Sequence, residues 1–199
     1  PVRVGEAGRF RERFGVGGDF LLYAGRVDPS KGCEEMFSYF RRYAKAHPDA
    51  LKLVVIGRPA MPIPKHPDIL ALGYVSEEDK IDAYRAASAL LMPSRYESLS
   101  IVLLEAWAQG TPALVSGSCR VLVGHCRRSN GGLYYNTYAE FEECVQLLLD
   151  EPMARARMGS NGRAYVLERY RWEAVCDGYL EMIEWVADVA GGGAGGSNV

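Results

Sequence analysis

Two glutamates, Glu97 and Glu105, lie eight positions apart within residues 93–112. On one continuous helix, a separation of eight positions turns two side chains roughly 80° apart, so both carboxylates could not point at one small ligand. A loop followed by a helix fits the residues better, because Ser100 suits an N-cap and Gly110 suits a helix stop. We therefore expect Glu97 on the loop and Glu105 inside the helix.

The start of such a helix is suited to binding an anion. The first backbone N–H groups, here near Ser100 and Ile101, lack partners within the helix, and the helix dipole is positive at this end. The neighbouring carboxylate of Glu97 can accept hydrogen bonds from hydroxyl groups attached to that anion. A nucleoside diphosphate sugar carries both kinds of group, so this stretch predicts a site for such a ligand.

A second cluster of charged residues follows the apolar run of residues 20–25. Arg26 and Lys31 lie between this expected strand and a helix that begins near Cys33 and repeats apolar residues at helical spacing. Open α/β sheets bind ligands at the carboxyl ends of their strands. An arginine fork and a lysine point charge match the negative charges of a diphosphate. The alternative for these two residues is a solvated turn with ordinary surface cations.

The two glutamates belong to a longer pattern: Pro93-Ser94-x-x-Glu97, seven residues, then Glu105-Ala-x-Ala-x-Gly-x-Pro112. This pattern resembles the signature of the C-terminal domain of retaining GT-B glycosyltransferases, in the family called group 1 or family 4. The resemblance implies a domain that binds a nucleoside diphosphate sugar, whose sugar is transferred to an acceptor with retention of configuration. It does not identify the base, the sugar or the acceptor.

The resemblance also implies a role for each residue of the predicted site. Glu97 would hold hydroxyl groups of the transferred sugar, and Glu105 would hold the ribose hydroxyls. Arg26 and Lys31 would neutralise the diphosphate, and these two cations together with Glu97 form the predicted catalytic set. Backbone near Val75 would meet the nucleotide base. The full predicted donor-binding set is Gly25, Arg26, Lys31, Val75, Glu97, Leu99, Ser100, Ile101 and Glu105.

The chain departs from the family pattern at two places. Most members carry Gly-Phe-Gly after the first glutamate, whereas residues 98–100 read Ser-Leu-Ser, which keeps the amides but narrows the backbone freedom near the phosphates. The usual Gly-Gly-x-x-Glu segment is also absent after Gly117. The sequence assigns no role to His125, Cys126 or the pair Arg127-Arg128. A zinc site is disfavoured there, because no Cys-x-x-Cys pair or second histidine is near.

The remaining pattern predicts the elements that would position these residues. A chain of 199 residues that is 48% hydrophobic can form one domain with a substantial core. Alternating apolar runs and helical repeats predict a doubly wound, mostly parallel α/β sheet, Rossmann-like and one half of a GT-B fold. We expect a linker tail over residues 1–19, the nucleotide-sugar-binding domain over residues 20–190, and a flexible Gly-rich tail over residues 191–199. The expected strands are 20–25, 51–56, 69–75, 89–92, 113–116 and 133–135, and the later helices are 77–87, 100–109, 139–149, 152–169 and 172–189.

Composition limits the partners and the compartment. A net charge of −2 argues against nucleic acid. Five cysteines without paired spacing favour a reduced, cytoplasmic setting, and no apolar run approaches the roughly 20 residues that span a bilayer. We expect no cofactor and no metal, because there is no Asp-x-Asp motif. By the resemblance, the chain is the C-terminal half of a longer protein whose N-terminal domain binds the acceptor and could contact a membrane peripherally.

Two other classes of function remain open at this point. A related GT-B epimerase or phosphorylase would share the sheet and a phosphate site, although the glutamate spacing together with Gly-Arg and Lys-Gly is not expected of it. A non-catalytic nucleotide-binding module is the other alternative. The sequence does not determine the oligomeric state.

Overall fold

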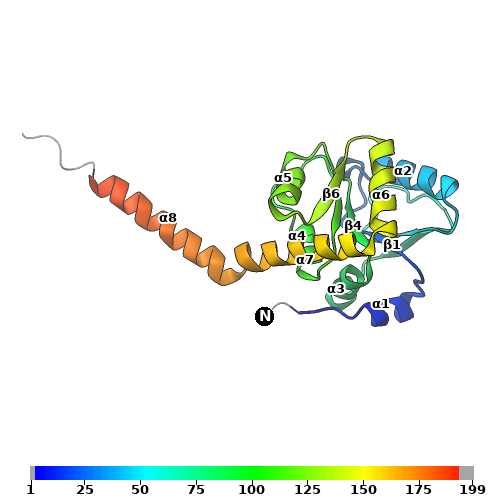
Figure 1. Ribbon diagram of the computed structural model, residues 1–199, viewed down its shortest axis with the longest axis horizontal. Coiled ribbons are helices and arrows are strands. Elements are labelled where there is room, and N and C mark those ends of the chain that lie inside the picture. The colour runs from blue at the N-terminus through cyan, green and yellow to red at the C-terminus, as the bar shows by residue number, and fades with distance from the viewer. Residues whose placement is uncertain (1–2, 193–199) are drawn as a thin grey trace, which may run out of the picture. The chain divides into compact units, whose positions relative to one another are not determined.

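The structure is a computed structural model that describes residues 3–192 (Figure 1). The chain divides into two compact units, residues 1–164 and residues 165–199. The first unit is built on one sheet of six strands, all pairing in parallel, in the order β3-β2-β1-β4-β5-β6. This order confirms the predicted doubly wound, Rossmann-like α/β fold. The strands are β1 Phe20–Ala24, β2 Lys52–Ile56, β3 Ile69–Gly73, β4 Ala89–Met92, β5 Ala113–Ser116 and β6 Gly132–Tyr135.

The strand order reverses beside β1, and this reversal defines the edge where a ligand is expected. The chain runs outward from β1 through β2 to β3, then returns to the other side of β1 as β4. Leu21 of β1 therefore pairs with Leu53 on one side and with Ala89 on the other. Every residue of β1 and β4 is buried, which explains their unbroken apolar runs. Ligands of such sheets bind beyond the carboxyl ends of the strands at the reversal, here after Ala24 and Met92.

The helices that sequence patterning predicted in the first unit are present and differ from the predictions only at their ends. Helices α2 and α6 pack together against one face of the sheet, where Phe37, Phe40 and Phe141 belong to the main buried cluster (Figure 1). Helices α3 and α4 contact each other. The bounds are η1 Pro29–Lys31, a single 3₁₀ turn, then α2 Cys33–Ala46, α3 Glu77–Ala86, α4 Ile101–Ala108, α6 Tyr138–Asp150 and α7 Pro152–Arg169, which crosses into the second unit.

The linker tail predicted for residues 1–19 is corrected by the structure. Residues Ala7–Phe14 form helix α1, which packs on α3 and buries Phe10 completely. Arg9 Nη2 lies 2.9 Å from Asp82 Oδ1, and Arg13 Nη1 lies 2.9 Å from Asp79 Oδ1. The apolar content of this stretch is low because ion pairs to buried carboxylates supply part of the packing. The pair Phe10 and Phe14 at helical spacing was the available signal.

Helix α5, Arg120–Ser129, also has no counterpart in the sequence analysis. Its buried residues Leu122, His125, Cys126 and Ser129 recur every three or four positions, which is the spacing of a helix with one face inside. Arginines and glycine between them mask the pattern. The helix ends where Asn130 adopts a left-handed conformation, with φ of 49°.

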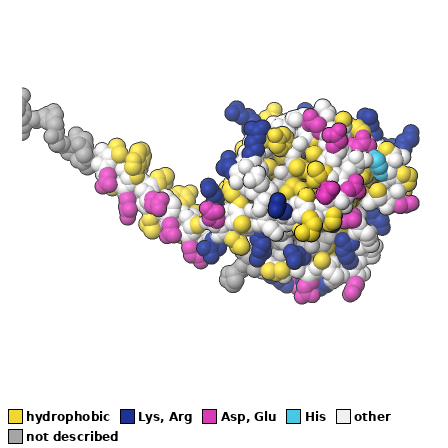
Figure 2. Space-filling view, viewed as in Figure 1, with side chains coloured by type: hydrophobic (Ala, Val, Ile, Leu, Met, Phe, Trp, Pro, Cys, Tyr) yellow, Lys and Arg dark blue, Asp and Glu magenta, His cyan; other side chains and the backbone are white. Residues whose placement is uncertain are grey.

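The second unit contains the end of α7 and helix α8, Trp172–Gly192, which continues through Gly191 and Gly192, the start of the predicted tail. Residues 193–199 of that tail lie outside the described residues. Along α8, apolar side chains are visible on its surface in Figure 2. Those at least half exposed are Trp172, Tyr179, Leu180, Met182, Ile183, Trp185, Val186 and Val189. Among residues 3–192, no helix combines the length and the hydropathy needed to cross a membrane.

Candidate functional site

A cavity of about 450 Å³ opens at the sheet reversal, beyond the ends of β1 and β4. Its volume is within the range of roughly 300–1,000 Å³ that is typical of small-molecule sites. Seven of the nine predicted donor-binding residues line it, and Val75 and Glu105 do not. The lining residues are Tyr23, Ala24, Gly25, Arg26, Lys31, Met92, Ser94, Glu97, Ser98, Leu99, Ser100, Ile101 and Val102.

A close backbone contact fixes the spacing of the two segments that form the cavity. Gly32, which follows η1, has φ of 75°, and a Cβ atom there would lie 2.3 Å from the Pro93 carbonyl oxygen. Only glycine fits both the left-handed conformation and this approach. Lys31 is therefore held against the start of the loop that carries Glu97.

Lys31 and Glu97 form an ion pair across the cavity, although 66 positions separate them in the chain. The Lys31 Nζ atom donates to Glu97 Oε1 at 2.9 Å. The two side chains are 37% and 14% exposed, so the glutamate is the more enclosed partner. An anionic group entering the cavity would share the lysine ammonium with Glu97. Sequence reasoning assigned the two residues to different parts of the ligand and did not foresee the contact between them.

Arg26 has a carboxylate partner that the sequence analysis passed over. Its Nη2 atom lies 3.1 Å from Asp28 Oδ2, and 60% of the Arg26 side chain is exposed. Hydrogen bonds from Ser30 hold the pKa of the Asp28 carboxyl below its usual value, so Asp28 is charged at neutral pH. The Tyr23 hydroxyl donates to the Arg26 carbonyl at 2.6 Å and fixes the backbone here. The spacing Arg-x-Asp was the signal for this pair.

Ser100 occupies the N-cap position of α4 as predicted, but its side chain does not cap the helix. Its backbone is left-handed, with φ of 64° and ψ of 75°, whereas side-chain capping requires an extended residue. Among the residues that the structure describes, the Ser100 hydroxyl oxygen is buried without a hydrogen-bond partner. The first amides of α4 therefore receive no hydrogen bond from the N-cap side chain beside the cavity.

Glu105 lies on α4, as predicted, and it faces α3. Glu105 Oε1 accepts from Lys80 Nζ at 3.2 Å, and Oε2 accepts from the Tyr84 hydroxyl at 2.9 Å. Burial, with the neighbouring Glu105 charge, raises the pKa of Tyr84, so its hydroxyl remains a donor. The Glu105 side chain keeps 34% of its surface exposed. The carboxylate is thus oriented by two donors and still reachable from solvent.

The two residues that follow β3, Tyr74 and Val75, differ in their exposure to solvent. Tyr74 is 85% exposed, whereas Val75 is 8% exposed. The predicted contact of Val75 with a base could therefore be made only through its backbone. That contact stays a prediction.

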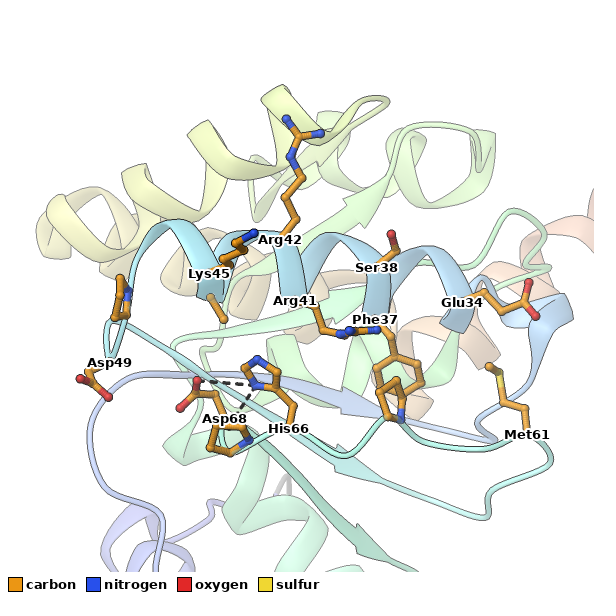
Figure 3. A pocket seen from close by; sticks show the side chains of 14 residues that line it. Glu34, Phe37, Ser38, Arg41, Arg42, Lys45, Asp49, Met61, His66 and Asp68 are labelled. Atoms are coloured by element: carbon orange, nitrogen blue, oxygen red, sulfur yellow. Dashed lines mark hydrogen bonds and ion pairs between the residues drawn. The ribbon is translucent and has the colours of Figure 1, made fainter.

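A second hollow, of about 830 Å³, lies between α2 and residues 61–68 (Figure 3). Arg41 and His66 face each other across it, and Arg42 points away from it. His66 Nδ1 is 3.6 Å from Asp68 Oδ2. None of the predicted site residues lines this hollow, which flanks a helix and a connection and does not lie at the strand ends.

No group of three or more histidine, cysteine or acidic residues within residues 3–192 is arranged to hold a metal ion. His125 and Cys126 are buried on α5. The prediction that the site needs no metal or cofactor is not tested by this observation.

The protein-family model described as "Glycosyl transferases group 1" matches residues 6–165. D-inositol 3-phosphate glycosyltransferase of Acidothermus cellulolyticus is 28% identical over 89% of this chain and 44% of its own length. Mannosylfructose-phosphate synthase of Agrobacterium fabrum is 31% identical over 92% of this chain and 44% of its own length. The chain thus spans less than half the length of these curated relatives.

Among solved structures, the Anabaena protein HepE in complex with UDP-glucose superposes with a TM-score of 0.75 at 15% identity. The similarity covers 89% of this chain and 52% of that one. At this level of identity the comparison shows a shared fold.

Proposed function

Because the chain belongs to the group 1 glycosyl transferases, we propose that it binds the nucleoside diphosphate sugar for a retaining glycosyltransferase. One observation carries the proposal: a single cavity at the sheet reversal brings Arg26, the Lys31–Glu97 pair and the start of α4 together. This cavity offers cations and amides for a diphosphate beside a carboxylate for hydroxyl groups. The bound UDP-glucose of HepE, a protein of the same fold, supports this assignment.

The diphosphate would lie against Lys31, Arg26 and the first amides of α4. As the glycosidic bond breaks, negative charge develops on the leaving diphosphate, and fixed cations and helix amides stabilise it without reorganisation. Because Lys31 is already held by Glu97, its ammonium is positioned before the ligand arrives. Arg26 is more exposed and would close onto the outer phosphate oxygens.

The two glutamates would serve different parts of the donor. Glu97 lines the cavity and would accept hydrogen bonds from sugar hydroxyls, while Glu105 lies outside the lining and would bind the ribose diol. Retaining glycosidases place two carboxyl groups about 5–5.5 Å apart on either side of one bond. Glu105 is oriented by α3 and does not share the cavity, so we assign neither glutamate as a nucleophile. Retention of configuration is proposed from the motif alone.

A second domain would supply the acceptor site. The curated relatives are more than twice as long as the segment that this chain matches. We propose an N-terminal acceptor-binding domain in the same protein, and a cytoplasmic location. Free thiols at Cys33, Cys119, Cys126, Cys144 and Cys176 suit a reducing compartment.

The expected result for this 199-residue chain is binding without transfer. Calorimetry with UDP, GDP and ADP should detect one nucleoside diphosphate that binds, since the phosphate site is contained in this chain. Incubation with the corresponding sugar nucleotide and candidate acceptors should give no glycosylated product. Absence of binding to all three diphosphates would contradict the proposal. In the longer protein, the anomeric configuration of the product, read by NMR, tests retention, and absence of turnover would favour a non-catalytic module.

A further inference from the structure

Tyr23 lies near the carboxyl end of β1 and lines the cavity, yet the proposed function gives its side chain no role. The residue is 3% exposed and belongs to the main buried cluster. Burial raises the pKa of Tyr23 far above its usual value, so the hydroxyl keeps its proton near neutral pH and can donate. It donates to the Arg26 carbonyl at 2.6 Å. A core side chain thus contacts the backbone of a proposed phosphate-binding residue.

The end of β2 holds only one side of the segment that carries Arg26. The Val27 amide donates to the Arg58 carbonyl at 3.0 Å, and the Val27 carbonyl accepts from the Ala60 amide at 2.8 Å, as in a parallel ladder. Alternate residues of such a ladder direct their backbone groups to opposite sides, so the Arg26 carbonyl faces away from β2. On that side the pairing of β1 with β4 has already ended. The Tyr23 hydroxyl supplies the hydrogen bond that no strand gives to this carbonyl.

The peptide between Arg26 and Val27 is therefore held at both of its polar groups. Tyr23 holds the carbonyl and the end of β2 holds the amide. Because the peptide is planar, these two hydrogen bonds set the backbone direction from which the Arg26 side chain leaves. That side chain is 60% exposed and pairs with Asp28, so little packing holds it directly. The direction of the Arg26 guanidinium thus depends on its backbone.

Lys31 is held by other contacts. Its Nζ atom is paired with Glu97 at 2.9 Å, and the close approach of Gly32 to Pro93 fixes the backbone next to it. The hydrogen bond from Tyr23 is therefore expected to act on one of the two cations of the cavity and not on the other.

We infer that Tyr23 is a positioning residue of the cavity: its hydrogen bond to the Arg26 carbonyl directs the Arg26 guanidinium toward a bound diphosphate. This inference rests on the proposed function. The Tyr23 hydroxyl hydrogen is already donated, and the oxygens of an ionised diphosphate are acceptors, so the hydroxyl would not bind the phosphates itself. Its effect on diphosphate binding passes through Arg26.

The test uses Tyr23→Phe, which keeps the ring and removes only the hydroxyl. The variant is made alone, with Arg26→Ala and with Lys31→Ala, and melting temperatures are recorded. Calorimetry measures binding of UDP, GDP and ADP and of their nucleosides. Tyr23→Phe alone should weaken diphosphate binding about 2- to 10-fold, because the lost hydrogen bond lowers the population with Arg26 in place, and nucleoside binding should be unchanged. The same factor is expected with Lys31→Ala, and no further loss with Arg26→Ala.

Tyr135→Phe is the matched control. Tyr135 belongs to the same buried cluster, and its hydroxyl is buried without a hydrogen-bond partner among residues 3–192. This variant should leave diphosphate binding unchanged. An equal loss in Tyr135→Phe, unchanged diphosphate affinity in Tyr23→Phe, or a full further loss with Arg26→Ala would overturn the inference. Failure of Tyr23→Phe to fold would make Tyr23 a folding residue and overturn it as well.

A measurement without ligand separates this inference from the proposed function. If the parent binds none of the three diphosphates, the proposed function fails, and amide hydrogen exchange at Val27 then decides whether the Tyr23 hydroxyl holds the Arg26–Val27 peptide. Faster exchange of the Val27 amide in Tyr23→Phe, with parental exchange in Tyr135→Phe, supports the positioning role. Unchanged exchange in both variants removes it.

Discussion

Lys31→Ala is expected to weaken binding of a nucleoside diphosphate by about 10- to 100-fold, because a hydrogen bond to a charged group contributes about 1.5–3 kcal/mol. Binding of the nucleoside alone should be unchanged. The loss has two sources. One phosphate contact disappears, and Glu97, which is 14% exposed, is left as an uncompensated negative charge beside the diphosphate. Calorimetry on the folded variant measures both affinities.

Glu97→Gln is the second single variant of a double-mutant cycle with Lys31→Ala. This change releases the Lys31 ammonium from its ion pair at 2.9 Å, so affinity for the bare diphosphate should not fall. In the double variant, part of the loss caused by Lys31→Ala should be recovered, because the repelling carboxylate is gone. Lys45→Ala on α2, which lines the other hollow, is the matched control and should leave diphosphate binding unchanged. Strictly additive losses would show that Lys31 and Glu97 do not meet at the phosphate site.

Arg26→Ala is expected to act in the same direction as Lys31→Ala. The Arg26 guanidinium is more exposed than the Lys31 side chain and already has Asp28 as a partner. The loss of diphosphate affinity should therefore lie near the lower end of the range of about 10- to 100-fold. Diphosphate affinity that is unchanged in both cation variants would place the phosphates elsewhere.

Glu105→Gln is expected to weaken binding of the bare diphosphate about tenfold, because a charged acceptor for the ribose diol is replaced by a neutral one. The melting temperature should change little, since the Tyr84 hydroxyl can donate to the amide oxygen and Lys80 keeps Glu77 at 2.9 Å. Glu97→Gln should instead reduce the additional affinity of the sugar nucleotide over the diphosphate. A two-by-two titration of the two variants with both ligands separates these effects.

Glu77→Gln is the matched control for Glu105→Gln. Both glutamates pair with Lys80, but the Glu77 side chain is 73% exposed. If the Lys80 network matters only for folding, the two variants should behave alike. Loss of diphosphate binding in Glu97→Gln, together with normal binding in Glu105→Gln, would reverse the assignment of the two glutamates.

Local patterning predicted the elements of this fold because it reports which side chains must be buried. The apolar runs of β1 and β4, and the loop-to-helix change between Glu97 and Glu105, could be predicted for this reason. Helix α5 was missed because exposed arginines and a glycine lie between its buried residues in the sequence and obscure their spacing. Helix α1 was missed because ion pairs to buried carboxylates on α3 replace part of its apolar packing.

The features of the site that the sequence did not predict depend on contacts between residues far apart in the chain. Nothing near Lys31 indicates that Glu97 is its partner, and the pair becomes visible only when β1 and β4 lie side by side. Similarly, serine at position 100 favours an extended N-cap when considered alone. The structure instead gives Ser100 a left-handed conformation, with φ of 64° and ψ of 75°.

The docking of α1 determines where this domain can be shortened or hinged. The Gly5 amide donates to Gln109 Oε1 at 2.9 Å, and Gln109 Nε2 donates to the Arg3 carbonyl at 2.8 Å, so the segment from Arg3 onward is attached to α4. A truncation that starts at Phe20, where the sheet begins, would strip the arginines from Asp79 and Asp82, whose side chains are 4% and 1% exposed. If the proposed N-terminal domain precedes this one, a hinge between them is expected ahead of Arg3, because residues 3–19 are attached to α3 and α4 and would move with the sheet.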